Sequence, residues 1–132
     1  MRDSVPTEII TKTATGSVEM VVAHLTDLVE ARGMKVFAVV DHSGEARRAG
    51  LTLRDTLVVV FGSPTAGTPV MVASPLAALD LPLKVLVWDD RGHTKVSYTD
   101  PAALAARYDL EPELAERFAG IHALTDALIQ QT

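Results

Sequence analysis

Cysteine is absent from the 132-residue sequence. The chain therefore has no thiolate nucleophile, no redox dithiol, no iron–sulfur cluster and no zinc site built on cysteine. Aromatic residues are scarce, with three Phe, two Tyr and one Trp, so Val, Leu, Ile and Ala must form the core. The length and the 48% of hydrophobic residues predict one globular domain over residues 1–132, large enough to fold without a disulfide or a metal.

Positive charge is in deficit, because 17 acidic residues face 12 basic ones and the formal net charge is −5. This balance opposes binding to nucleic acid and to an anionic membrane surface. The longest apolar runs, such as Leu57 to Phe61, have only five residues, too few to cross a bilayer. Residues 1–8 contain no apolar run typical of a signal peptide. We expect a soluble, cytoplasmic protein with no nucleic-acid or membrane partner.

The periodicity of apolar residues predicts alternating strands and helices. Residues 7–14 and 34–41 are expected to be strands, the first at a sheet edge and the second apolar on both faces, hence covered on both. Between them, Ser17 as N-cap and Gly33 as C-terminal stop bound the firmest helix. Residues 43–49 fit a short helix, and residues 56–61 fit a central strand.

The second half contains turn and cap signals that predict a hairpin and several short helices. Residues 62–69 are expected to form a loop, with Thr68 as N-cap and Pro69 as first residue of a short helix. Residues 84–89 and 93–99 form the hairpin, residues 102–108 a helix, and Pro112 opens the last helix. The fold class is α+β, a mostly antiparallel sheet with helices on one face. Because an uncovered strand face needs a partner, we expect a homodimer.

Common catalytic patterns are missing: there is no His-Glu-x-x-His, Gly-x-Ser-x-Gly or Gly-x-Gly-x-x-Gly. The first candidate is Asp41-His42 at a predicted strand end, where His42 could act as a general acid or base. The favoured alternative is that the two residues cap the following turn or that His42 is exposed. His24 and His122 are interpreted as structural, because each has only one acidic neighbour at ligand spacing and two ligands do not make a metal site.

The second candidate is the segment from Phe61 to Pro69. Gly62 and Gly67 have the spacing of a phosphate-binding P-loop, but Thr68-Pro69 stands where the lysine is required. A P-loop is therefore excluded. Two interpretations remain: a ligand-binding loop, or a rigid connector between a strand and a helix. Its candidate residues are Gly62, Ser63, Pro64, Gly67 and Thr68.

Three further residues are weaker candidates. Trp88 and the following Asp89-Asp90 could line a pocket or bind a metal, although a charged hairpin turn is the favoured interpretation. The hydroxyl of Tyr98 could meet a ligand. Asp100 precedes Pro101 and is most simply an N-cap. No metal and no cofactor is expected.

Several of these segments also match a known family pattern, in order along the chain: Asp41-His42, Phe61-Gly62-Ser63-Pro64 with Gly67-Thr68-Pro69, Leu79 to Trp88, and Val96-Ser97-Tyr98 with Asp100-Pro101. The chain resembles the domain-of-unknown-function family 302 from about residue 7 to residue 129. Ser63 and Thr99 stand where the family pattern has asparagine. The resemblance implies a TATA-binding-protein-like topology, β-α-β(4)-α with additions, and a homodimer. It implies no catalytic residues and no DNA binding.

These observations lead to one expected function and two alternatives. The chain is expected to be a homodimeric small-molecule-binding or interaction module without catalysis. The first alternative is an enzyme that uses His42 as general acid or base, with Ser63, Thr68 or Tyr98 positioning substrate. That enzyme needs His42 and another polar group within one pocket. The second alternative is a structural dimer that acts through a protein partner.

Overall fold

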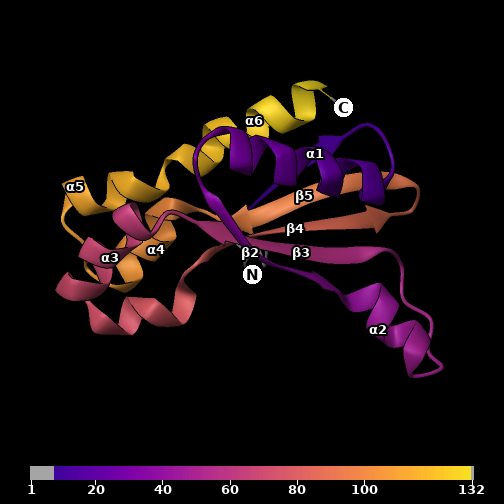
Figure 1. Ribbon diagram of the computed structural model, residues 1–132, viewed down its shortest axis with the longest axis horizontal. Helices are drawn as coiled ribbons and strands as arrows, with labels where there is room; N and C mark the ends of the chain where they lie inside the picture. Colours follow the sequence, from indigo (N-terminus) through magenta and orange to yellow (C-terminus); the bar gives the residue numbers. More distant parts are fainter. Residues whose placement is uncertain (1–7, 132) are drawn as a thin grey trace, which may run out of the picture.

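A five-stranded antiparallel sheet is the centre of the molecule, and the computed structural model describes residues 8–131 (Figure 1). The strand order is β1-β5-β4-β3-β2, and both strands predicted from the first 41 residues lie at the two edges. The bounds are Ile9–Ala14 for β1, Lys35–Asp41 for β2, Thr56–Gly62 for β3, Leu83–Asp90 for β4 and His93–Thr99 for β5. The α+β class and the β4–β5 hairpin are confirmed.

Two long helices cover one face of this sheet, α1 (Val18–Ala31) and α6 (Gly120–Gln131) (Figure 1). Ser17 caps α1 as predicted, because its side chain accepts from the Met20 backbone N–H at 3.1 Å. Gly33 ends the helix at φ +75°, a conformation in which an added Cβ would be strained. The shorter elements are α2 (His42–Arg48), α3 (Pro64–Ala73), η1 (Pro75–Asp80), α4 (Pro101–Arg107), α5 (Pro112–Ala115) and η2 (Glu116–Phe118).

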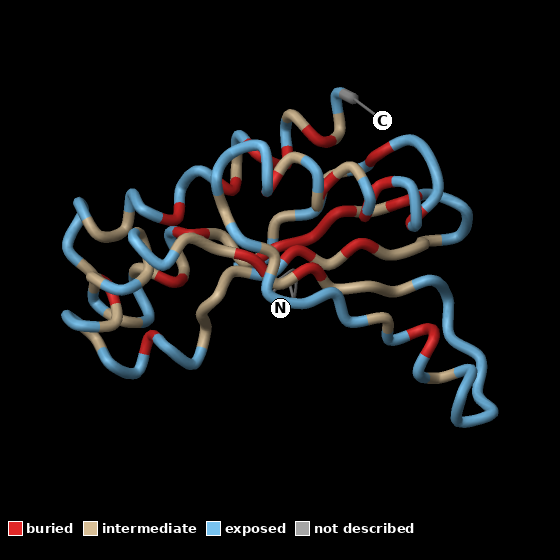
Figure 2. Tube along the Cα trace, viewed as in Figure 1, coloured by how far each residue is buried: buried red, intermediate tan, exposed pale blue. Residues whose placement is uncertain are grey.

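The core lies between the sheet and these two long helices, where buried residues concentrate in Figure 2. Alternation along each strand divides the residues between two faces. On β3, Val59 and Phe61 are buried against the helices, while Val58 and Val60 point to the opposite side and are only half-buried. Aliphatic side chains dominate the core, as the composition predicts, and include Val21, Leu25, Val29, Val85, Val87, Val96, Leu124 and Leu128.

None of the helices within residues 8–131 covers the opposite face of the sheet. We call it the open face; its apolar residues are Ile9, Ala38, Val40, Val58, Val60, Leu86 and Trp88. In Figure 1, α2 descends beside one end of this face, and α3 with η1 descends beside the other. The expectation that both faces of β2 are covered is wrong within one chain, because β2 is an edge strand whose Phe37, Val39 and Val40 are exposed.

Two helix boundaries differ from the prediction. Helix α3 begins at Pro64 and contains Pro69, so Thr68 is not its N-cap. The first proline after the extended Ser63 suits the first helical position, and this signal prevails over the later Thr68-Pro69 pair. The predicted last helix is divided into α5, η2 and α6, and the break falls beside Gly120, a residue of low helix propensity.

Candidate functional site

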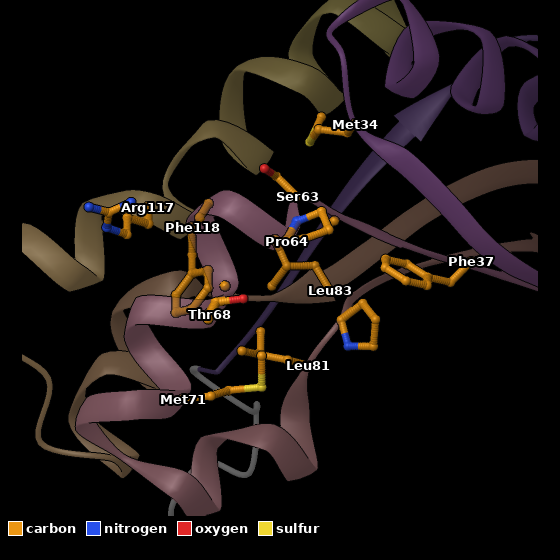
Figure 3. A pocket seen from close by; sticks show the side chains of 14 residues that line it. Met34, Phe37, Ser63, Pro64, Thr68, Met71, Leu81, Leu83, Arg117 and Phe118 are labelled. Atoms are coloured by element: carbon orange, nitrogen blue, oxygen red, sulfur yellow. The ribbon is translucent and has the colours of Figure 1, made fainter.

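An apolar pocket of about 350 Å³ lies at the end of the sheet where β2 begins, β3 ends and β4 begins. Helix α3 and η2 supply its remaining walls (Figure 3). Its volume falls within the range of small-molecule sites. The lining residues are Met34, Phe37, Gly62, Ser63, Pro64, Ala66, Gly67, Thr68, Met71, Leu81, Pro82, Leu83, Arg117 and Phe118.

Local backbone features open this space. The pairing of β2 with β3 shifts register between Val36 and Ala38, so Phe37 sits in a bulge and its side chain reaches the pocket. Gly62 and Gly67 add no side chain to it. A Cβ on Gly67 would point at Leu81 Cδ1 and at the methyl of Met71, each 3.9 Å away. The backbone at Gly67 does not itself require glycine, but a large side chain there would occupy part of the pocket.

Few polar groups face this pocket. Ser63 Oγ and Thr65 Oγ1 bond each other at 2.8 Å. The hydroxyl of Thr68 has no hydrogen-bond partner within residues 8–131, and Figure 3 shows it directed inside the ring of labelled side chains. Among the described lining residues, only Arg117 has an ionisable side chain. The chemistry offered is apolar contact, one or two hydroxyls and one guanidinium.

The guanidinium lies at the edge of the pocket (Figure 3). Arg117 Nη1 donates to the carbonyl oxygen of Thr65 at 3.4 Å, a long and weak bond. In an α-helix that carbonyl would accept from the residue four positions later, which is Pro69, a residue with no N–H. Within the part of the chain that the structure describes, Arg117 forms no ion pair, so its other N–H groups are available.

Five sequence candidates converge here: Gly62, Ser63, Pro64, Gly67 and Thr68 all line the pocket. Sequence analysis missed the partners that come from distant segments. Met34 follows the α1 stop, Phe37 lies in a β-bulge, and Arg117 lies on a short 3₁₀-helix. No local motif identifies such residues, because only the tertiary fold brings them to the end of β3.

His42 is not part of this site. Its neighbour Asp41 pairs with Leu57 at the start of β3, five residues before Gly62, which corresponds to about 17 Å along a strand. The His42 side chain is exposed. Asp41 caps α2, accepting from the Gly44 N–H and the Ser43 hydroxyl, both at 2.8 Å. These bonds to the carboxylate, the Gly44 N–H first, lower the pKa of Asp41 below its usual value.

The remaining candidates lie in two other places. Trp88 is on the open face, where its indole N–H donates to Ser97 Oγ at 3.0 Å. Asp89 accepts from the Gly92 N–H at 3.1 Å and so supports the hairpin turn. Asp100 is the N-cap of α4 and accepts from the Ala102 N–H at 3.0 Å.

Tyr98 meets His122, the histidine interpreted as structural. Tyr98 is 3% exposed and its hydroxyl lies 2.8 Å from His122 Nδ1. The other ring nitrogen of His122 is 3.9 Å from Asp100 Oδ1. Asp126 bonds Lys12 at 2.8 Å rather than His122. This Tyr98–His122–Asp100 group lies outside the lining of the apolar pocket.

A second polar group joins η1 to α4. The Tyr108 hydroxyl and Arg107 Nη1 both donate to Asp80 Oδ2, Arg107 from 2.8 Å. Arg107 also bonds Glu8 at 2.9 Å. The Tyr108 hydrogen bond, and then Arg107, lower the pKa of Asp80 below its usual value. These contacts hold η1 and therefore the adjoining pocket wall at Leu81.

Two other kinds of feature are absent from the described residues. Residues 8–131 contain no cluster of three or more His, Asp or Glu side chains placed to hold a metal ion. None of their helices combines the length and apolar character needed to cross a membrane.

The sheet topology and the pocket place the chain among small α+β domains, and sequence comparison defines the family. The profile described as "Domain of unknown function DUF302" matches residues 10–128. The chain belongs to the DUF302 family. The crystal structure of an uncharacterized conserved DUF302 protein from Bacillus stearothermophilus is similar, with a TM-score of 0.79 and 19% identity over 95% of this chain and 98% of that one.

Curated relatives are larger than this chain. A protein of Brucella suis named "Fluoride-specific ion channel FluC 1" is 34% identical over 111 residues, which cover 83% of this chain and 44% of that protein. A Brucella abortus protein of the same name has the same identity, and the match covers 41% of it. The chain thus spans less than half the length of the curated relatives it matches.

Proposed function

We propose that this chain is a small-molecule-binding module and that the pocket at the end of β3 is its binding site. The observation that supports this most directly is the convergence of three separate sheet segments and two helices on one apolar cavity of about 350 Å³. Apolar pockets of this size with a few polar groups are the usual form of ligand sites. Two methionines, Met34 and Met71, line it, and methionine adapts readily to differently shaped ligands.

Binding is favoured over catalysis by the make-up of the pocket. General acid–base chemistry needs a titratable group within hydrogen-bond reach of the substrate. The described lining residues offer a guanidinium, which stays protonated, and hydroxyls with no adjacent base. His42, which the alternative enzyme requires, is exposed at the other end of β3.

Methionine methyl signals provide the test. In protein labelled at the methionine methyls, neutral apolar probes such as indole and cyclohexanol should shift the Met34 and Met71 signals. Met20, exposed on α1, should not respond. Gly67→Leu extends a side chain toward Leu81 and Met71 and should abolish the response. Shifts that persist in folded Gly67→Leu, or that never appear in the unmodified protein, would refute the proposal.

The open face favours a second role, self-association. Its apolar residues are exposed or only half-buried in one chain, an arrangement typical of surfaces that meet a partner. We propose that a second copy covers it around a two-fold axis, because identical apolar surfaces complement each other in such a dimer. The central position of Leu86 and Trp88, on the strand between β3 and β5, places them near the middle of the contact.

Sedimentation equilibrium tests the dimer. The unmodified protein should sediment as a dimer, and Leu86→Lys should shift it to a monomer by burying a charge at the contact. Met20→Lys is the matched control, because Met20 is an exposed apolar residue on the helix side and its replacement should leave the dimer intact. A monomer at high concentration would exclude self-association and leave the open face for a different protein.

A further inference from the structure

We propose that the natural ligand of the pocket is a monocarboxylate with an apolar body, whose carboxylate binds Arg117. This inference rests on the proposed binding function and specifies its ligand. Three properties support it: the charge of the pocket, the availability of Arg117, and the distribution of polar groups over the pocket wall.

The charge of the pocket selects against cations. Although the chain has 17 acidic residues, none of the described lining residues is Asp or Glu. A ligand ammonium would enter an apolar space with a guanidinium at its edge and no anion to pair with, which is strongly unfavourable. The ligand is therefore neutral or negatively charged.

Arg117 favours the negative ligand. A planar guanidinium presents five N–H donors that match the two oxygens of a carboxylate. One N–H of Arg117 makes a long, weak bond to the Thr65 carbonyl at 3.4 Å, and the other donors of the guanidinium are available. Among residues 8–131, Arg48 pairs with Glu45, and Arg107 pairs with Asp80 and Glu8. Arg117 has no such pair within the described residues.

A ligand with a single polar head group would match the few polar side chains of the pocket wall. Thr68, whose hydroxyl has no partner among residues 8–131, is the second polar contact. The rest of the surface is formed by aliphatic, thioether and aromatic groups such as Leu81, Met71 and Phe118. One cation neutralises a monoanion but not a phosphate dianion, and the apolar wall gives a sugar or a peptide few hydrogen bonds. An aliphatic or aromatic carboxylate would bind Arg117 and Thr68 through its head group and contact the apolar wall with its body.

Octanoate, octanol and octylamine share a hydrocarbon chain and differ in head group. Comparing them therefore separates the effect of the head-group charge from that of apolar contact. Each is titrated at neutral pH by calorimetry and by the methyl signals of Met34 and Met71. Octanoate should bind about ten-fold more tightly than octanol, since a hydrogen bond to a charged group adds about that factor, and octylamine should bind least. Arg117→Gln should reduce octanoate binding to the level of octanol. Arg54→Gln is the matched control for loss of one positive charge, because Arg54 lies in the loop before β3.

The outcomes distinguish the ligand class from the pocket itself. If octanol binds as tightly as octanoate, or if Arg117→Gln changes nothing, the carboxylate assignment is wrong while the pocket stands. If no probe shifts Met34 and Met71, or if Gly67→Leu binds normally, the binding function fails as well. Should Gly67→Leu not fold, Ala66→Phe fills the same space from the preceding residue and serves as the blocked variant.

Discussion

Arg117 and the Thr65 carbonyl form a contact that spans from η2 to the first turn of α3. Pro69 lies four residues after Thr65 and has no N–H, so the carbonyl lacks its helical partner and the guanidinium bonds it from outside. The bond is long and therefore weak, and it places the guanidinium beside the first turn of α3. The irregularity of α3 and the placement of the pocket's cation therefore have one cause.

Pro69→Ala should stabilise the fold. Alanine restores the N–H that the Thr65 carbonyl lacks, and we expect the free energy of unfolding to rise by about 1 kcal/mol, the gain being limited by the added freedom of the unfolded chain. Pro64→Ala is the control, because proline at the first helical position removes no bond, and it should not stabilise. Urea denaturation of both variants measures this. Equal changes in the free energy of unfolding for the two variants would mean that the N–H restored at position 69 gains no hydrogen bond to the Thr65 carbonyl.

Two glycines should respond oppositely to alanine. Gly67 lies inside α3, and a Cβ there meets only ordinary contacts at 3.9 Å, so Gly67→Ala should stabilise by about 0.5–1 kcal/mol. Gly33 has φ +75°, and Gly33→Ala should destabilise by about 1–2 kcal/mol. Thermal unfolding compares the two variants. A destabilised Gly67→Ala would show that the helix tolerates no side chain at that position.

Stability should fall at acidic pH partly through Asp80. Its pKa in the folded state lies below the usual 3.8, so its contribution is complete above that value and is lost as the pH falls through the lower, folded-state pKa. Asp80→Asn should destabilise the protein by about 1 kcal/mol at neutral pH and give a shallower loss of stability as the pH falls below 3.8. Chemical denaturation at several pH values provides the measurement. Parallel curves for the two proteins would contradict this role.

Tyr98 and His122 should be energetically coupled. Tyr98→Phe removes one hydrogen bond and should cost about 1 kcal/mol, and His122→Phe removes the same bond from the other side and should cost about as much. The double variant should then lose less than the sum of the two. Urea unfolding of the four proteins gives this cycle. Additive losses would indicate that the 2.8 Å contact contributes nothing to stability.

Sequence patterns predicted the elements whose signals are local. The N-cap Ser17, the stop at Gly33 and the cap Asp100 were each correct, because the bonds involved join residues at most a few positions apart. The edge position of β1 and the β4–β5 hairpin were also predicted. The start of α3 was not, because two competing Pro signals five residues apart, Pro64 and Pro69, give no local basis for choosing between them.

Part of the lining of the pocket comes from the segment that the sequence singled out. Gly62 to Thr68 is a contiguous segment with an unusual composition, and it does line the pocket. Phe37 reaches the pocket only because β2 has a bulge, and a bulge shifts the alternation on which face assignments depend. Arg117 could not be found from sequence because its placement depends on how η2 packs against α3. The candidates His42, Trp88 and Tyr98 were chosen from local sequence features alone, and the fold places them outside the pocket.

The run Val58-Val59-Val60 presents the same side chain to two environments. Val59 is fully buried beneath the helices, while its neighbours on the open face are only half-buried. In a saturation mutagenesis screen, polar replacements at the middle valine should reduce the amount of folded protein. The same replacements at Val58 or Val60 should leave the amount of folded protein unchanged and should reduce only the proposed self-association. Substitutions at these three adjacent positions would thus distinguish effects on folding from effects on the proposed self-association.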